Sequence, residues 1–204
     1  MIATQRRLLA DLLSGLSDGE WATSSLCSGW TVREVAAHLT MAFDLSKLSL
    51  VVQVVKAGGN YDKVADRYAK TAAAAPPSTL VATLRANAES RFTPPGLGPE
   101  APLTDIVVHG LDIGVPVGKV PPLPAESANT VLGFLVSPKA TRGFVRKGLV
   151  AGLRCESSDS GWAAGSGPSV SGTAQSLVLA LTGRRAGLAG LAGEGAGDLA
   201  RRLG

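Results

Sequence analysis

The residues with the clearest chemical potential are two histidines and one carboxylate. The chain of 204 residues holds two histidines, His38 and His109, and Asp105 lies four positions before His109. On a helix this spacing places Asp105 and His109 on one face, where they can chelate a single ion. Two imidazoles and a carboxylate suit a divalent metal with an open position, and zinc, nickel, iron and manganese are all chemically reasonable.

Each of these residues also has an ordinary structural explanation. A lone histidine on an apolar helix face is more often a hydrogen-bonded core residue than a metal ligand. Asp105 also fits as a first-turn carboxylate favoured by the helix dipole, although Thr104 is itself a good cap. Spacing alone leaves both interpretations open.

Two predicted helices must position the three side chains. Thr31 and Glu34 form a capping box, in which a hydroxyl and a carboxylate satisfy backbone donors at a helix start. The pattern predicts a helix over residues 31–55, so His38 lies two turns inside a well-defined start. Residues 103–115 have apolar side chains at helical spacing and carry the other two candidate ligands.

Further helices complete a bundle in the first part of the chain. Apolar periodicity and proline breaks predict them at residues 2–16, 61–75 and 78–91, the last with Ser78 as its cap. The proline-rich and glycine-rich residues 93–102 are predicted to form a loop, because proline cannot continue a helix. The first 115 residues therefore read as a bundle of four or five helices.

The composition changes after this bundle. A proline-rich connector is followed by predicted elements of both kinds: a helix at 126–135, a strand at 149–157, a glycine-rich hairpin or paired strands at 161–172, and helices at 173–181 and 197–203. Helices followed by mixed strands and helices indicate an α+β protein. We expect two domains, a helical metal-binding bundle over residues 1–118 and a small α+β domain over residues 125–204.

Composition excludes several classes of protein. With 45% hydrophobic and 18% charged residues, the chain is neither collagen-like nor disordered nor a coiled coil. Its net charge is +4, but the arginine pairs are isolated, so we expect no nucleic-acid partner. The apolar stretches fall short of the ~20 residues that cross a bilayer, and no signal-peptide core is evident. We expect a cytoplasmic protein, with no membrane association, whose two cysteines remain thiols.

Three motifs in order resemble one enzyme family. Residues 27–39, CSGWTVREVAAHL, resemble the helix-opening motif of the mycothiol-dependent maleylpyruvate isomerase family, a branch of the DinB-like metalloenzymes. Residues 105–113, DIVVHGLDI, resemble its second motif, acid-x3-His-Gly-x-Asp. Glycine-rich segments between Gly161 and Arg184 resemble the sterol-carrier-like domain that follows the bundle in many members.

The resemblance implies a DinB-like four-helix bundle in which His38, Asp105 and His109 hold a metal, usually zinc. Asp105 departs from the family pattern, because the acid is commonly glutamate and aspartate is one methylene shorter. This leaves open whether Asp105 binds the ion directly or through water, and whether the ion is zinc or another divalent metal such as nickel. Oligomeric state is also open between a monomer and a homodimer.

The implied chemistry is activation of a small thiol. Zinc with two neutral imidazoles and one carboxylate keeps a net charge of +1, so a bound thiol ionises well below its ordinary pKa of about 8.5. The resemblance implies mycothiol as cosubstrate, for cis-trans isomerisation or S-transfer on a small, carboxylate-bearing electrophile. The alternative is a non-catalytic protein of the same fold that binds a metal or a small molecule.

Four further residues are candidates for a role in or near the site. Asp112 is able to orient His109 as a hydrogen-bond acceptor, or it makes a structural hydrogen bond. Arg184 is a candidate clamp for a substrate carboxylate, or a solvated arginine at a helix end. Cys27 precedes the helix of His38 and is able to approach the site, although a buried thiol is the usual explanation for a lone cysteine. Trp30 is interpreted as a packing anchor.

Overall fold

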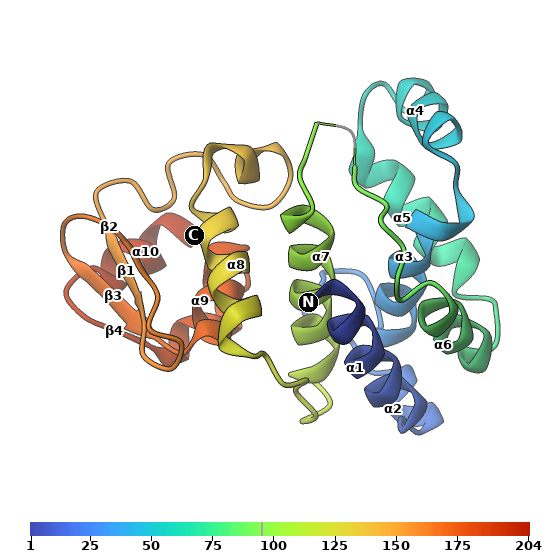
Figure 1. The fold of residues 1–204 in the computed structure, drawn as a ribbon, viewed down its shortest axis with the longest axis horizontal. Coiled ribbons are helices and arrows are strands. Elements are labelled where there is room, and N and C mark those ends of the chain that lie inside the picture. Colours follow the sequence, from blue (N-terminus) through green and yellow to red (C-terminus); the bar gives the residue numbers. More distant parts are fainter. Residues whose placement is uncertain (95) are drawn as a thin grey trace. The chain divides into compact units, whose positions relative to one another are not determined.

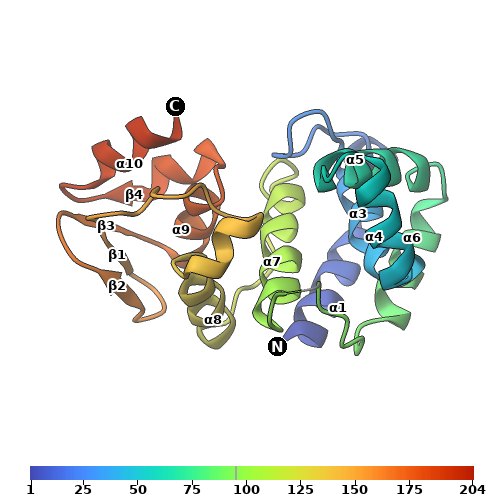
Figure 2. The same cartoon turned by 90° about the horizontal axis from the view of Figure 1, so that it is seen from above.

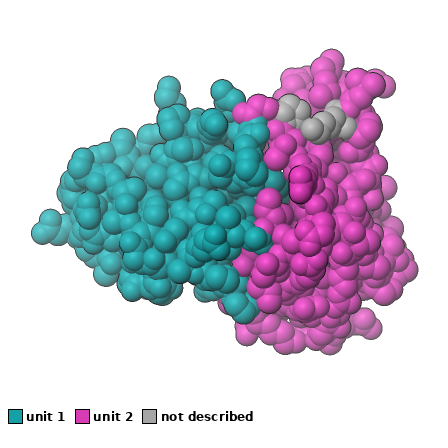
Figure 3. Space-filling view, in the orientation of Figure 1, with its two compact units in different colours: residues 1, 97–108, 122–204 teal, residues 2–96, 109–121 magenta. Residues whose placement is uncertain are grey.

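The computed structural model describes residues 1–94 and 96–204 (Figure 1). Pro95, inside the loop predicted over residues 93–102, lies outside the described residues. The chain divides into two compact units, coloured separately in Figure 3. We call residues 2–96 and 109–121 the helical unit, and residues 1, 97–108 and 122–204 the mixed unit. The division into domains over residues 1–118 and 125–204 stays a prediction.

The first part of the chain is helical. Its helices are α1 (Ile2–Ser14), α2 (Asp18–Trp21), α3 (Val32–Asp44), α4 (Lys47–Lys56), α5 (Tyr61–Ala72), α6 (Pro77–Ala86) and α7 (Glu100–Gly114). Helix α3 packs against α5 and α6, and α1 packs against α6. Apolar side chains with almost no exposed surface fill the space between these helices, among them Leu9, Leu13, Val35 and Leu84. The predicted helical bundle is therefore present, but the described residues up to Gly114 form seven helices instead of the four or five predicted.

Local capping explains where α3 begins. The Glu34 carboxylate accepts a hydrogen bond of 2.6 Å from the amide of Thr31, and a second of 3.0 Å from the Thr31 hydroxyl. The carboxylate thereby satisfies a backbone donor that a helix start leaves free. The predicted start of the helix that carries His38 is confirmed.

The single helix predicted over residues 31–55 is wrong, because two helices occupy that segment. Leu45 ends α3 in an extended conformation, with φ −105° and ψ 128°. The Ser46 hydroxyl then accepts a hydrogen bond of 3.1 Å from the amide of Ser49 and caps α4. The apolar residues after Ser46 continue the helical pattern, so the pattern places them in the same predicted helix. In the structure, apolar side chains of α4 such as Leu48 and Val55 are exposed.

Other predicted boundaries shift for local reasons. Helix α7 begins at Glu100, inside the segment predicted as a loop, because Pro102 lies in the first turn, where a helix needs no amide donor. Helix α6 begins at Pro77 after Pro76, so Ser78 is not its cap, and α6 ends at Ala86 instead of residue 91. The short helix α2 was not predicted, although Ser17 caps it.

The mixed unit combines a small sheet with helices (Figures 1 and 2). Its elements are α8 (Ala125–Leu135), η1 (Pro138–Arg142), β1 (Arg154–Ser157), β2 (Ala163–Gly165), β3 (Ser169–Gly172), α9 (Ala174–Leu181), η2 (Arg185–Gly190), β4 (Leu191–Ala192) and α10 (Ala196–Leu203). Strand order is β2-β1-β3-β4, with β1 and β3 parallel and the outer pairs antiparallel. Helix α9 packs on β1 and β3, and α8 packs on α9. The α+β fold class is confirmed.

Two strand predictions need correction. The strand predicted over residues 149–157 spans Arg154–Ser157, because the chain turns before it and Gly152 has a φ of +68° that side chains disfavour. Residues 161–172 do not form a hairpin, since β2 and β3 each pair with β1. Gly167 permits this arrangement, because a β-carbon there would lie 2.2 Å from the Gly152 carbonyl oxygen.

Candidate metal centre

His38 and His109 face one another inside the helical unit. His38 lies in α3 and is 7% exposed, and the side chain of His109 in α7 is 12% exposed. Their ring centroids are 4.9 Å apart and the ring planes meet at 77°. The two histidines of the chain therefore come from distant segments to one place.

Asp105 lies one turn before His109 on α7. One ligand atom each from His38, Asp105 and His109 lies within 4.8 Å of the others. Zinc bonds of about 2.0–2.2 Å place the ligand atoms of a tetrahedral site roughly 3.4 Å apart, so the atoms of this set lie near the spacing that an ion requires. Two imidazoles and a carboxylate thus fit a divalent metal in chemistry and in spacing.

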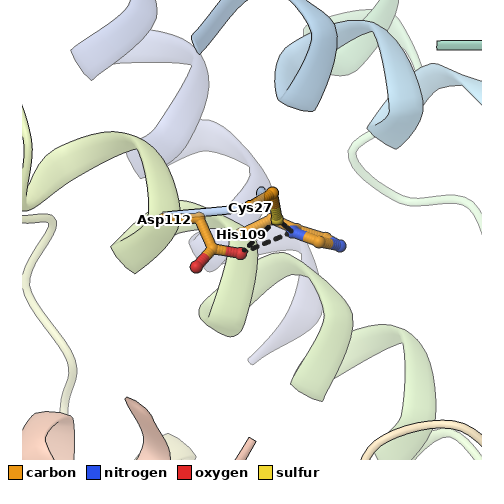
Figure 4. Close-up of side chains that lie close together, drawn as sticks. All are labelled: Cys27, His109 and Asp112. Atoms are coloured by element: carbon orange, nitrogen blue, oxygen red, sulfur yellow. Dashed lines mark hydrogen bonds and ion pairs between the residues drawn. The ribbon is translucent and has the colours of Figure 1, made fainter. Parts of the chain in front are cut away.

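Asp112 contacts His109 at the ring nitrogen Nδ1. Its carboxylate has no exposed surface, and its Oδ2 lies 2.9 Å from Nδ1 of His109 (Figure 4). A carboxylate only accepts when it is ionised, and in that form of Asp112 the proton of this bond belongs to Nδ1 of His109. The other ring nitrogen, Nε2, then keeps its lone pair for a metal.

Cys27 reaches the same carboxylate from the loop before α3. Its Sγ donates a hydrogen bond of 3.0 Å to Oδ2 of Asp112 and lies 3.7 Å from Nδ1 of His109 (Figure 4). The three side chains also form a possible metal-binding group. Because Oδ2 is 2.9 to 3.0 Å from both partner atoms, which are hydrogen-bond distances, we interpret this group as hydrogen-bonded.

Trp30 touches the other histidine, which the sequence interpretation missed. Its indole lies 5.2 Å from the His38 ring, centroid to centroid, at a tilt of 42°. The indole Nε1 donates a hydrogen bond of 2.9 Å to Asp66 of α5. Hydrogen bonds from Lys70 and then from Trp30 hold the pKa of Asp66 below its usual value. The only sequence signal was an aromatic residue directly before the helix cap.

Arg184 belongs to the mixed unit, between α9 and η2, where its side chain is half-buried. Its Nη1 donates a hydrogen bond of 2.7 Å to the carbonyl oxygen of Thr182. Its role as a clamp for a substrate carboxylate stays a prediction. Cys155 is a buried residue of β1.

No helix in the described ranges has both the length and the apolar character needed to cross a bilayer. The longest, α7, has 15 residues and includes charged side chains.

Comparison with known proteins gives one family. The family model for the mycothiol maleylpyruvate isomerase N-terminal domain matches residues 2–114. A solved structure titled as the mycothiol-dependent maleylpyruvate isomerase superposes with a TM-score of 0.51 at 17% identity, over 95% of this chain and 93% of that one. A histidine-to-alanine mutant of that isomerase gives a TM-score of 0.50 at the same identity and coverage. No curated protein matches. At this identity the structural likeness concerns the fold, and the match over more than half of the sequence shows that the chain belongs to the mycothiol maleylpyruvate isomerase family.

Proposed function

We propose that this protein is a divalent-metal-dependent enzyme that uses mycothiol as a cosubstrate. Its reaction is cis-trans isomerisation or S-transfer on a small, carboxylate-bearing electrophile. The convergence of His38, Asp105 and His109 carries the proposal, because this donor set matches a catalytic metal and lies in a mycothiol-associated family. We propose zinc as the ion, with nickel as the alternative.

Each residue of the centre has a separate task. His38 and His109 bind as neutral imidazoles, and Asp105 supplies one negative charge, so the site retains a net charge of +1 with a divalent ion. When bound, such an ion supplies an open position at which the pKa of a thiol falls far enough for ionisation at neutral pH. Asp112 keeps the proton on Nδ1 of His109 and so directs Nε2 to the ion.

The substrate side of the proposal rests on chemistry. In an isomerisation the mycothiol sulfur adds to a conjugated cis double bond, the resulting single bond rotates, and the sulfur departs, so no atom is gained or lost. In an S-transfer the adduct is retained. Arg184 is our proposed partner for a substrate carboxylate, because a guanidinium forms paired hydrogen bonds with a carboxylate. We place this reaction in the cytoplasm, with small molecules as the partners.

Metal analysis of the purified protein tests the centre directly. We expect about one zinc ion or other divalent ion per chain, and loss of that ion in the His38→Ala and His109→Ala variants. Asp44→Asn serves as a control, because Asp44 also lies on α3 and its carboxylate accepts hydrogen bonds from Thr40 and Tyr68 instead of contacting the centre. Equal metal content in wild type and both histidine variants contradicts the proposal.

An assay with mycothiol and the metal then distinguishes an enzyme from a binding protein. Conjugated cis acids are incubated with the loaded protein, and the trans isomer or a stable thioether is measured by chromatography. Product formation that disappears in the His38→Ala variant supports the enzyme. Affinity for mycothiol with no product from any electrophile supports the non-catalytic alternative.

A further inference from the structure

A short loop holds Cys27 against the carboxylate behind His109. The amide and the hydroxyl of Ser25 donate hydrogen bonds of 3.0 and 2.9 Å to the Trp30 carbonyl oxygen. The Ser25 hydroxyl also accepts one of 3.1 Å from the Cys27 amide, and the Trp30 amide donates one of 3.1 Å to the Cys27 carbonyl oxygen. The backbone on both sides of Cys27 is therefore fixed within its own loop.

The same loop is also joined to the helix of His109. The Leu26 amide donates a hydrogen bond of 3.1 Å to the backbone carbonyl oxygen of Asp112. This bond lies next to the one from the Cys27 thiol to the Asp112 side chain. Backbone and side chain of Asp112 are thus both bound by consecutive residues of one loop.

One carboxylate oxygen receives both donors. Oδ2 of Asp112 accepts the Nδ1 proton of His109 at 2.9 Å and the Cys27 thiol proton at 3.0 Å. Asp112 has no exposed surface, so bulk water does not supply a replacement donor. A buried carboxylate that loses one of its donors is held less firmly in position, because each hydrogen bond to a buried charged group contributes to its stability.

We propose that Cys27 is a positioning residue, which fixes the Asp112 carboxylate and through it the ring of His109. The effect of Cys27 on metal affinity rests on the proposed function, whereas its effect on the position of the His109 ring does not. The thiol acts as a donor and not as a nucleophile paired with His109. The His109 nitrogen nearest to it is 3.7 Å away and is already bonded to Asp112 at 2.9 Å.

The first measurement uses metal-free protein labelled with ¹⁵N in histidine. The chain has two histidines, so spectra show two rings and His38→Ala assigns them. We expect the wild-type His109 ring to be protonated at Nδ1, with slow exchange of that proton with water. Cys27→Val fills a similar volume but cannot donate, and we expect it to accelerate that exchange. Cys27→Ser retains a donor, and we expect it to preserve the wild-type signal.

The second measurement is zinc affinity by competition with a chromophoric chelator. Removing the direct partner of a metal-bound histidine costs about 10- to 100-fold in affinity, so loss of Cys27, one step further away, should cost roughly 3- to 10-fold in Cys27→Val. Cys27→Ser should bind zinc within about twofold of wild type. Cys155→Ala is the matched control, because it removes the buried cysteine of β1 in the mixed unit.

The outcomes separate this inference from the proposed function. Wild-type protein that binds no metal overturns the proposed function, while the ring spectra still decide the role of Cys27. If the Nδ1 proton of His109 exchanges with water equally fast in Cys27→Val and in wild type, the inference is overturned. Equal loss of zinc affinity in Cys27→Ser and Cys27→Val also overturns it, because the packing of the side chain and not its hydrogen bond would then be responsible. If Cys27→Val does not fold by circular dichroism, Cys27→Ala gives the same comparison without a donor.

Discussion

Replacing Asp112 by asparagine removes the negative charge behind His109 and keeps the size of the side chain. In the wild-type protein, Oδ2 accepts hydrogen bonds of 2.9 Å from His109 and 3.0 Å from Cys27 in a fully buried position. The carbonyl oxygen of asparagine can accept both bonds, but as a neutral group. Asp112→Asn therefore measures the contribution of the charge to the metal centre.

The expected loss of zinc affinity in Asp112→Asn follows from the change of a charged hydrogen-bond acceptor to a neutral one. A bond to a charged group contributes about 1.5–3 kcal/mol and a neutral one about 0.5–1.5 kcal/mol, so the bond to His109 weakens by roughly 1–1.5 kcal/mol. A cation at Nε2 polarises the Nδ1 proton, and the difference therefore appears mainly in the metal-bound state. Since about 1.4 kcal/mol is tenfold, we expect the zinc Kd to increase about 5- to 13-fold.

The assay is a competition titration against a chromophoric zinc chelator at pH 7. Asp44→Asn is the matched control, because it neutralises a carboxylate of α3 that accepts a hydrogen bond of 3.2 Å from Thr40. A zinc Kd for Asp112→Asn within about twofold of wild type refutes the role of the Asp112 charge, because the hydrogen-bond partners of metal-bound histidines change metal affinity by more than this. A loss beyond about 1,000-fold also refutes it, because it would indicate that Asp112 is itself a ligand.

Two further predictions concern stability and thiol chemistry outside the centre. Arg6 is 4% exposed and donates hydrogen bonds to the carbonyl oxygens of Asn87, Ala88 and Ser90, which follow α6. Arg6→Met should therefore lower the free energy of unfolding, measured in urea, by about 2–4 kcal/mol. The exposed Arg7→Met should change it by less than about 1 kcal/mol, and equal effects would contradict the assignment. Burial raises the pKa of the Cys155 thiol, so this thiol ionises at a lower pH in the unfolded chain than in the folded protein. Its contribution to the free energy of unfolding is therefore present at lower pH and is lost as pH rises through the pKa of the folded state. A thiol-labelling time course at pH 8 should therefore modify Cys155 only on unfolding, and rapid labelling in the folded state would contradict this.

Local signals in the sequence predicted the helices that carry the centre. A hydroxyl and a carboxylate three residues apart defined the start of α3, and the structure has that cap. The later end of the same helix was predicted wrongly, because the apolar run after Ser46 continued the helical pattern. Periodicity reports which side chains share a face, but it does not report that Leu48 and Val55 of α4 remain exposed.

The partners of the two histidines were predictable to different degrees. Asp112 follows His109 by three positions on one helix, so their contact was already a stated alternative. Trp30 lies eight positions before His38, on the other side of a helix cap, and its ring contact depends on how the loop folds back. No periodic rule relates a loop residue to a helix face, so packing alone decides such a contact.

The sequence by itself determined the residue types and their spacing along α7. Asp105, His109 and Asp112 are related by the fixed rise and rotation of an α-helix, so their relative placement follows from the chain locally. Only the tertiary structure decided that the ring of His38 lies 4.9 Å from that of His109, and that the Cys27 thiol bonds to Asp112. Those contacts join segments separated by most of the bundle. They depend on how the helices pack, which is a property of the whole apolar core and not of any short run of residues.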